Sequence, residues 1–263
     1  MLERIVATAP VFLLVAVRCF ALIRTTPLLS SSAVPGVAKV ALAGFAAYLV
    51  LPSVESYGWN IDANHLSYIF LLLGEALIGV ITGFYITMIY AAFSSAGQFF
   101  SLQMGFSAAE SYDALSQIEN PLMGQYLNLV AMLVFLQIKG FQTLFVTGVT
   151  KSFSALNAVS MISGRERFLS FLLKGLTELF LDAMMISLPM IASLFLVTTS
   201  MGILSKAAPQ MNLLSEGLPI TILVTFFLLS QLIPVMTNFF AVLFERGFEK
   251  VATLFTSFMA GTS

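Results

Sequence analysis

The segment that decides the fold, residues 66–93, reads LSYIFLLLGEALIGVITGFYITMIYAAF. Glu75 is the only charged residue in it. The segment exceeds the roughly 20 apolar residues that an α-helix needs to cross the hydrocarbon core of a bilayer. Outer-membrane strands would instead alternate apolar and polar residues over about ten positions. The segment therefore predicts a membrane-spanning helix and an all-α polytopic membrane protein.

The composition of the whole chain agrees with this prediction. Of its 263 residues, 59% are hydrophobic and only 10% are charged, whereas about 25% of the residues of a soluble domain are charged. Most of the exterior must therefore face membrane lipid or other apolar protein. The 12 Lys and Arg nearly balance the 13 Asp and Glu, so nucleic-acid binding and a polybasic membrane anchor have no electrostatic basis.

Apolar runs separated by Gly, Pro and Ser clusters predict about six long hydrophobic helices. They are residues 5–23, 37–51, 66–93, 122–149, 168–199 and 218–244. Arg18 interrupts the first run, which favours a retained helix over a cleaved signal peptide. The second run is short and the fourth is broken near Lys139 and Gly140, a pattern typical of helices that line a cavity or are buried against protein. Residues 94–121, rich in Gly, Ser and Ala, predict a long loop of the kind that is often functional or disordered.

Glu75 is the residue of the long apolar segment that needs an explanation. It shares one helix face with Gly79 and Gly83, because the spacing is i, i+4, i+8. A carboxylate at membrane depth costs several kcal/mol unless it is paired or protonated, so it must face protein or water. Two interpretations follow: a structural contact to a neighbouring helix, for example to Arg18 or to another chain, or a proton or ion site.

Two further polar stripes lie on apolar segments. Such stripes most often hold helices together, so we expect both in helix packing or in subunit interfaces. The residues of the first are Lys174, Glu178 and Asp182, and those of the second are Gln231, Pro234 and Asn238.

Enzyme chemistry finds little support in this sequence. His65 is the only histidine and Cys19 the only cysteine, so neither a catalytic triad nor a zinc cluster can be assembled from an obvious set. Phosphate-loop, dinucleotide and metalloprotease motifs are missing as well. We predict no catalytic residue, no cofactor and no metal.

Two stretches of the chain resemble a known family. The first reads GQFFSLQMGFS over residues 97–107, with Tyr-Asp at 112–113 and Asn-Pro-Leu at 120–122. The second reads MGILSKAAPQMN over residues 201–212, followed by Gly-Leu-Pro-Ile at 217–220. Both resemble the FliR family, the R component of the flagellar type III export gate, which is related to the T component of injectisomes. Ala114 departs from the family, many members of which have Pro there.

The resemblance implies an architecture in which hairpins of helices join a helical assembly of P, Q and R subunits. Residues 1–165 would be a P-like part carrying a central plug loop at 94–121, and residues 166–263 a Q-like helical hairpin. The expected partners are FliP-like and FliQ-like gate subunits, an FlhB-like switch protein and unfolded flagellar export substrates. The expected place is the bacterial inner membrane, within the flagellar basal body.

The resemblance also implies roles for particular residues. The plug would involve residues 101–113, and the residues expected to gate the pore are Met104, Gly105, Phe106, Ser107 and Ala108. An inter-helix loop near the pore entrance would hold Lys206, Pro209, Gln210 and Asn212. The alternative function is a small secondary transporter with broken helices and Glu75 as its ion-coupling site; an intramembrane enzyme is the third.

Overall fold

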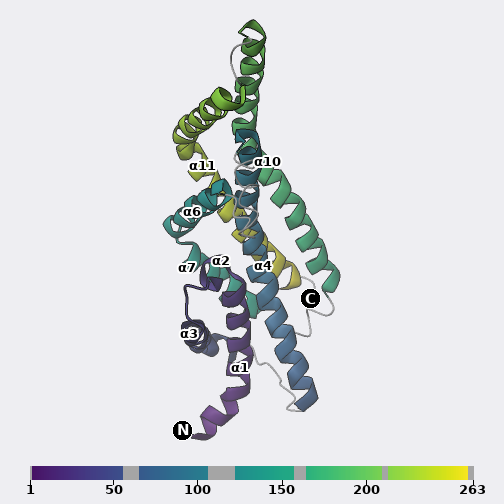
Figure 1. Cartoon of the computed structure of the whole chain (residues 1–263). Helices are drawn as coiled ribbons and strands as arrows, with labels where there is room; N and C mark the ends of the chain where they lie inside the picture. Colours follow the sequence, from purple (N-terminus) through teal and green to yellow (C-terminus); the bar gives the residue numbers. More distant parts are fainter. Residues whose placement is uncertain (1, 56–64, 106–121, 157–163, 209–212, 260–263) are drawn as a thin grey trace. The chain divides into compact units, whose positions relative to one another are not determined.

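A computed structural model describes residues 2–55, 65–105, 122–156, 164–208 and 213–259 of the chain. In these ranges all regular elements are helices, which confirms the predicted all-α class (Figure 1). Five helices are long and apolar enough to cross a membrane, or six if one bent pair counts as a single span. The chain forms two compact units. The first holds residues 1–89, 138–175 and 244–263, and the second holds residues 90–137 and 176–243.

The first unit begins with α1 (Leu2–Thr25), the short α2 (Pro27–Ser30) and α3 (Gly36–Glu55). The Lys39 amine is buried and donates to the carbonyls of Ser30 and Ser31, both at 2.9 Å, so it ties the start of α3 to the end of α2. The second predicted segment is not short, because α3 continues through Pro52 and offers a span of 19 residues. The expectation of a helix ending at Pro52 is therefore wrong.

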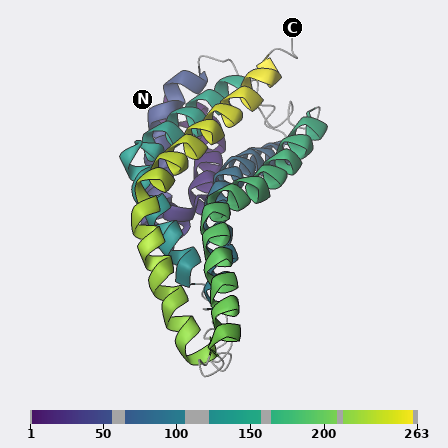
Figure 2. The same cartoon turned by 90° about the horizontal axis from the view of Figure 1, so that it is seen from above.

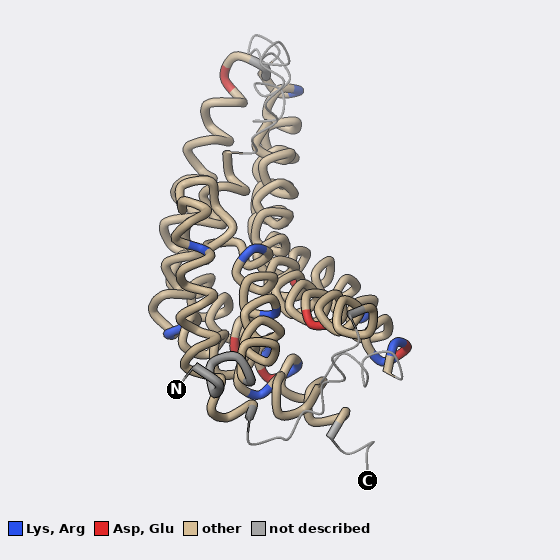
Figure 3. The backbone as a smooth tube through the Cα atoms, turned by 90° about the horizontal axis from the view of Figure 1, so that it is seen from below, with Lys and Arg blue, Asp and Glu red and all other residues tan. Residues whose placement is uncertain are grey.

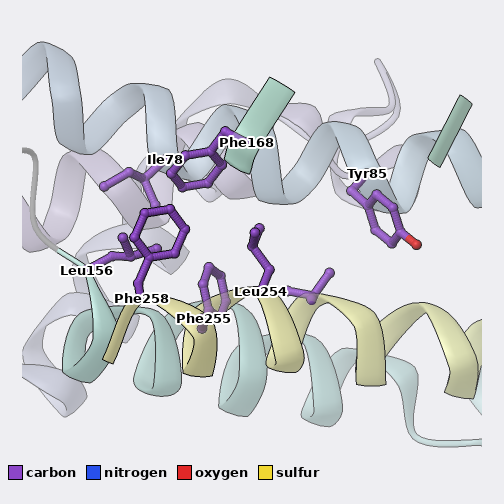
Figure 4. Packing of buried hydrophobic residues seen from close by; sticks show 8 residues of the cluster. Ile78, Tyr85, Leu156, Phe168, Leu254, Phe255 and Phe258 are labelled. Carbon is purple, nitrogen blue, oxygen red and sulfur yellow. The ribbon is translucent and has the colours of Figure 1, made fainter. Parts of the chain in front are cut away.

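The core of the first unit gathers side chains from four separate parts of the sequence. Figure 4 shows Ile78 and Tyr85 of α4 (His65–Met104) facing Phe255 and Phe258 of α11 (Leu213–Met259). Leu156 and, on α10 (Arg165–Ala207), Phe168 complete this cluster, and the Phe168 ring centroid lies 5.0 Å from that of Phe258. Aromatic burial of this kind stabilises packing beyond the area removed from the solvent.

The predicted break in the fourth segment is confirmed. Helix α6 (Leu122–Gln137) ends before Lys139, whose φ of 57° is left-handed and cannot continue a helix. The chain then resumes as α7 (Gly140–Leu144), the π-helix η2 (Phe145–Lys151) and α8 (Ser152–Ala155). These three short elements belong to the first unit.

Within the second unit, the end of α4 corrects a second expectation. Residues 94–104 are helical and were expected to form a loop. The small residues there allow close packing: a Cβ placed on Gly97 would lie 2.6 Å from the Cα of Gly124 on α6. Phe100 within this stretch and Phe93 just before it are both buried. Small residues at a helix interface let two backbones approach, and this is why a loop-like composition forms a helix here.

Helices α10 and α11 are the two longest in the described part of the chain, with 43 and 47 residues, and the second unit holds most of each. Over residues 176–207 and 213–243 the two helices run in opposite directions (Figure 2). Pro189 lies within α10, and Pro219 and Pro234 lie within α11. Charged residues are sparse along the helices (Figure 3). We refer to residues 176–207 and 213–243 as the two arms.

Candidate functional site

The buried pair of Arg18 on α1 and Glu75 on α4 is the main polar site of the first unit. Each side chain is only 1% exposed, and Arg18 Nε donates to Glu75 Oε2 at 2.6 Å. The guanidinium NH2 also contacts the same carboxylate oxygen. A planar guanidinium suits such a pairing better than an amine would. The structural interpretation of Glu75, with Arg18 as its partner, thus has direct support within the chain.

Arg18 reaches a third element as well. Its NH1 donates to Ser152 Oγ at 3.1 Å and its NH2 to the carbonyl of Leu156 at 2.9 Å. The guanidinium carbon lies 3.9 Å from the centroid of the Phe153 ring. These contacts compensate the cost of burying the cation, since a buried charge is tolerated only when it is paired and its hydrogen bonds are satisfied. One side chain therefore joins α1, α4 and α8.

Glycines let α1 and α4 approach closely enough for this pair to form. A Cβ on Gly79 would collide with the carbonyl of Arg18 and lie 2.9 Å from Ala21 Cβ. One helical turn further, a Cβ on Gly83 would lie 3.0 Å from the carbonyl of Leu22. In the structure, the face that Glu75 shares with Gly79 and Gly83 meets another backbone, and that backbone belongs to α1.

Hydrogen bonds extend this contact along both helices. The Tyr68 hydroxyl donates to the carbonyl of Pro10 at 2.9 Å. The Thr87 hydroxyl lies 2.8 Å from the carbonyl of Thr25 and 3.0 Å from that of Gly83, so it donates to one of them. Contacts advance in the same direction on both helices, from Pro10 and Tyr68 to Thr25 and Thr87, so the helices are parallel. We call this contact the α1–α4 seam.

The π-helix η2 packs against the seam. A Cβ on Gly148 would lie 3.1 Å from Leu22 Cδ1 and 3.4 Å from Thr82 Cγ2. π-Helical turns occur often at functional or strained positions, and this one is followed directly by Ser152, which bonds Arg18. The sequence gives no signal for Ser152, Phe153 or Leu156, because only the folded chain brings them to Arg18.

The seam is a structural arrangement rather than one suited to chemistry. The Glu75 carboxylate is buried and engaged by a cation, so it has no open face for a transported ion. Within the described residues, no group of three or more His, Cys, Asp and Glu could hold a metal ion. The geometry therefore supports a clamp between helices.

The predicted plug residues are described only at their start. Met104 is fully buried at the end of α4. Gly105 has a φ of 82°, the left-handed conformation typical of glycine after a helix C-terminus, and its N–H lies 3.3 Å from the carbonyl of Leu102. A Cβ on Gly105 would lie 2.5 Å from Leu218 Cδ2 of α11. Phe106, Ser107 and Ala108 lie outside the described residues.

The two polar stripes are only partly covered by the chain itself. Lys174 is exposed, and Glu178 and Asp182 are half-buried on α10. Gln231 and Asn238 are exposed on α11, with Gln231 Nε2 3.4 Å from Ser230 Oγ. Their role in subunit interfaces stays a prediction.

The predicted pore-entrance loop is shorter than expected. Lys206 is exposed in the last turn of α10, so residues 201–207 are helical rather than part of a loop. The apolar run before it simply continues the helix by another two turns. Pro209, Gln210 and Asn212 lie outside the described residues.

Comparisons with known proteins cover nearly the whole chain. The family model for bacterial export proteins, family 1, matches residues 9–247. The flagellar biosynthetic protein FliR of Bacillus subtilis is 33% identical over 251 residues, which are 93% of this chain and 95% of that protein. FliR of Escherichia coli is 30% identical over 237 residues, 90% and 89% of the two chains. The surface presentation of antigens protein SpaR of Shigella flexneri is 27% identical over 160 residues, 61% of each chain.

Proposed function

The chain belongs to the bacterial export proteins, family 1, and we propose on that basis that it is a structural and gating subunit of the flagellar type III export gate. Its relatives and its long apolar helices make it a membrane-embedded component of the flagellar export apparatus. In the proposal it forms a pore with FliP-like and FliQ-like subunits, contacts an FlhB-like switch protein and passes unfolded flagellar proteins. The pore belongs to the basal body in the bacterial inner membrane.

The exposed apolar surface of α10 and α11 is the observation that carries this proposal. The chain buries only 28% of the most apolar window of α10 and 17% of that of α11. Large side chains on the arms point outward, among them Phe195, Leu223 and Phe227. Membrane helices associate through close packing and through interhelical hydrogen bonds. Arms that carry the exposed polar groups Gln231 and Asn238 are therefore suited to partner helices rather than to lipid alone.

The root of the predicted plug supports the gating part of the proposal. Met104 is buried in the second unit, and Gly105 gives the chain a left-handed turn where α4 ends, inside the predicted plug of residues 101–113. A buried anchor followed by a glycine turn would let a short flap move without disturbing α4.

The role of Glu75 in this proposal is structural. Its carboxylate is paired with Arg18 inside the first unit, and this pairing accounts for a charge at membrane depth without an ion pathway. A secondary transporter would need Glu75 to release Arg18 in each cycle. The described contacts of Glu75 are those of a paired, buried carboxylate, so the transporter is not proposed.

Expression with and without partners tests the assembly part of the proposal. Expressed alone, the chain should aggregate or be degraded, because large apolar side chains of the arms are exposed. Co-expressed FliP-like and FliQ-like subunits should restore a stable complex. Size-exclusion chromatography in mild detergent measures the outcome. A stable, monodisperse monomer from solitary expression would contradict dependence on assembly.

Ion conductance tests the plug. Deleting residues 105–109 should leave the assembled complex intact and raise ion leakage, because close side-chain packing holds ions back in the closed state. The complex that carries both Met104→Ala and Phe106→Ala should leak fewer ions than the complex that carries the deletion. Planar-bilayer recording on the assembled complex decides between the alternatives. Unchanged conductance in the deletion, with assembly verified, would reject the plug.

A further inference from the structure

An apolar groove of about 360 Å³ opens between α3 and η2 in the first unit. Phe45, Ala46 and Leu49 of α3 form one wall, and Val146 and Val149 of η2 form the other. Eight of its nine lining side chains are apolar, and the ninth, Thr150, is exposed. None of them carries a charge. The groove therefore offers apolar contact to a hydrocarbon ligand, together with one hydroxyl group.

The helices that line this groove belong to candidate membrane spans. Helix α3 is a candidate span over Gly36–Val54, and η2 lies in the second half of the bent candidate span 122–155. The volume is at the small end of ligand-sized cavities, which measure about 300–1,000 Å³. A partner helix is about 10 Å across with its side chains and needs more space than this volume provides. A single acyl chain suits an apolar groove of this volume.

An exposed cation next in sequence to the groove lining bears on which lipid the groove takes. Lys151 follows the lining residue Thr150 directly and is exposed. It lies four residues before the end of α8, where a lysine can extend its amine to the headgroup level of the bilayer. The other nearby lysine, Lys39, is buried and donates to Ser30 and Ser31, so it does not serve the groove.

We propose that this groove holds one acyl chain of an anionic phospholipid, with the lipid phosphate at Lys151 and Thr150. A basic residue near the membrane surface attracts anionic headgroups, whereas the apolar walls accept either lipid charge type. The groove and the amine thus have separable roles: the walls bind the chain, and Lys151 selects the headgroup. This site does not depend on the export function proposed above.

Native mass spectrometry of the full-length chain, purified with its co-purifying membrane subunits, tests the site. The complex is placed in nanodiscs that contain phosphatidylcholine and phosphatidylglycerol, and retained lipids are counted. The wild type should retain one phosphatidylglycerol. Val146→Trp, which fills the groove, should reduce its retention about tenfold. The matched variant Val37→Trp, an exposed valine of α3 outside the lining, should retain it as the wild type does.

The headgroup part has its own pair of variants. Lys151→Gln should reduce phosphatidylglycerol retention about fivefold and leave phosphatidylcholine retention unchanged. Lys206→Gln, at an exposed lysine on α10, should change neither. Three results would overturn the proposal: equal retention in the two tryptophan variants, no retained lipid in the wild type, or protein instead of lipid cross-linked to a photoreactive group at Leu49. The last would assign the groove to a partner helix.

Discussion

The α1–α4 seam and the arms of α10 and α11 are both made of apolar helices that carry polar groups. They differ in where those polar groups find their partners. In the seam, the chain supplies every partner that Arg18 is seen to use, from Glu75 to the carbonyl of Leu156. In the arms, Gln231 and Asn238 are exposed and large apolar side chains face outward. The comparison suggests that the seam is stabilised within one subunit, whereas the arms are stabilised by assembly.

Breaking the ion pair should have the largest effect on the seam. Glu75→Leu leaves the Arg18 cation buried without its carboxylate, and removing one partner of a buried pair costs about 3–5 kcal/mol. Glu75→Gln should be milder, because an amide oxygen can still accept a hydrogen bond from Arg18. The single Cys19 is fully buried beside Arg18, so labelling by a thiol-reactive dye on heating measures when the seam opens.

The double variant Arg18→Leu with Glu75→Leu is the control for this prediction. It removes both charges and should recover part of the stability lost in Glu75→Leu alone. Motility and complex assembly, scored together for Glu75→Gln, separate a clamp from a coupling site. Lost motility with fully normal assembly would speak against the clamp.

Filling the seam should have the next largest effect. Gly79→Ala places a Cβ against the carbonyl of Arg18, and an added methyl in a packed contact costs about 1–3 kcal/mol. Gly44→Ala is the matched control, because a Cβ there meets nothing within 4 Å. It should be neutral or stabilising by up to about 1 kcal/mol. The same Cys19 labelling assay measures both, and equal melting temperatures would show that the close approach does not matter.

Changes in the arms should have the smallest effect on the chain and a selective effect on the complex. Asn238→Leu removes an exposed amide, and interhelical polar contacts in membranes are worth about 0.6 kcal/mol on average. Cys19 labelling should therefore be unchanged, whereas the yield of complex with FliP-like and FliQ-like subunits should fall. Ser230→Leu removes the hydroxyl that Gln231 contacts, so it extends the test to the Gln231 end of the same stripe. A fall in the melting temperature without a fall in complex yield would show that these arm residues stabilise the chain itself rather than its assembly with partners.

The sequence predicts much of the contact between α1 and α4, and little of the contact that Ser152 and Leu156 make with Arg18. Glu75, Gly79 and Gly83 stand out because helical spacing places a costly carboxylate and two small residues on one face. The sequence offers Arg18 as one partner for Glu75, beside a residue of another chain or an ion, so the contact with α1 is one of the alternatives that it predicts. Ser152 and Leu156 cannot be found in this way, because their link to Arg18 spans more than 130 residues and depends on the π-helical turn before them.

The misplaced boundaries share one physical cause. Residues 94–104 have the composition of a loop, yet Gly97 and its neighbours form a close helix contact with Gly124. Pro52 also looks like a terminator, yet α3 continues through it to Glu55. Small residues and proline mark loops in water, whereas in apolar helices the same residues permit close packing or a kink. The break at Lys139 was predictable because charge and glycine coincide there.

Photo-cross-linking of the arms tests most directly whether they are built for partner subunits. A diazirine analogue of phenylalanine replaces Phe195 or Phe227, both exposed on the arms, and Phe255 of the buried core is the control. In cells that make the whole export apparatus, we expect both arm positions to form adducts with small apolar membrane subunits and position 255 to form none. Adducts only with lipid at both arm positions would contradict the account.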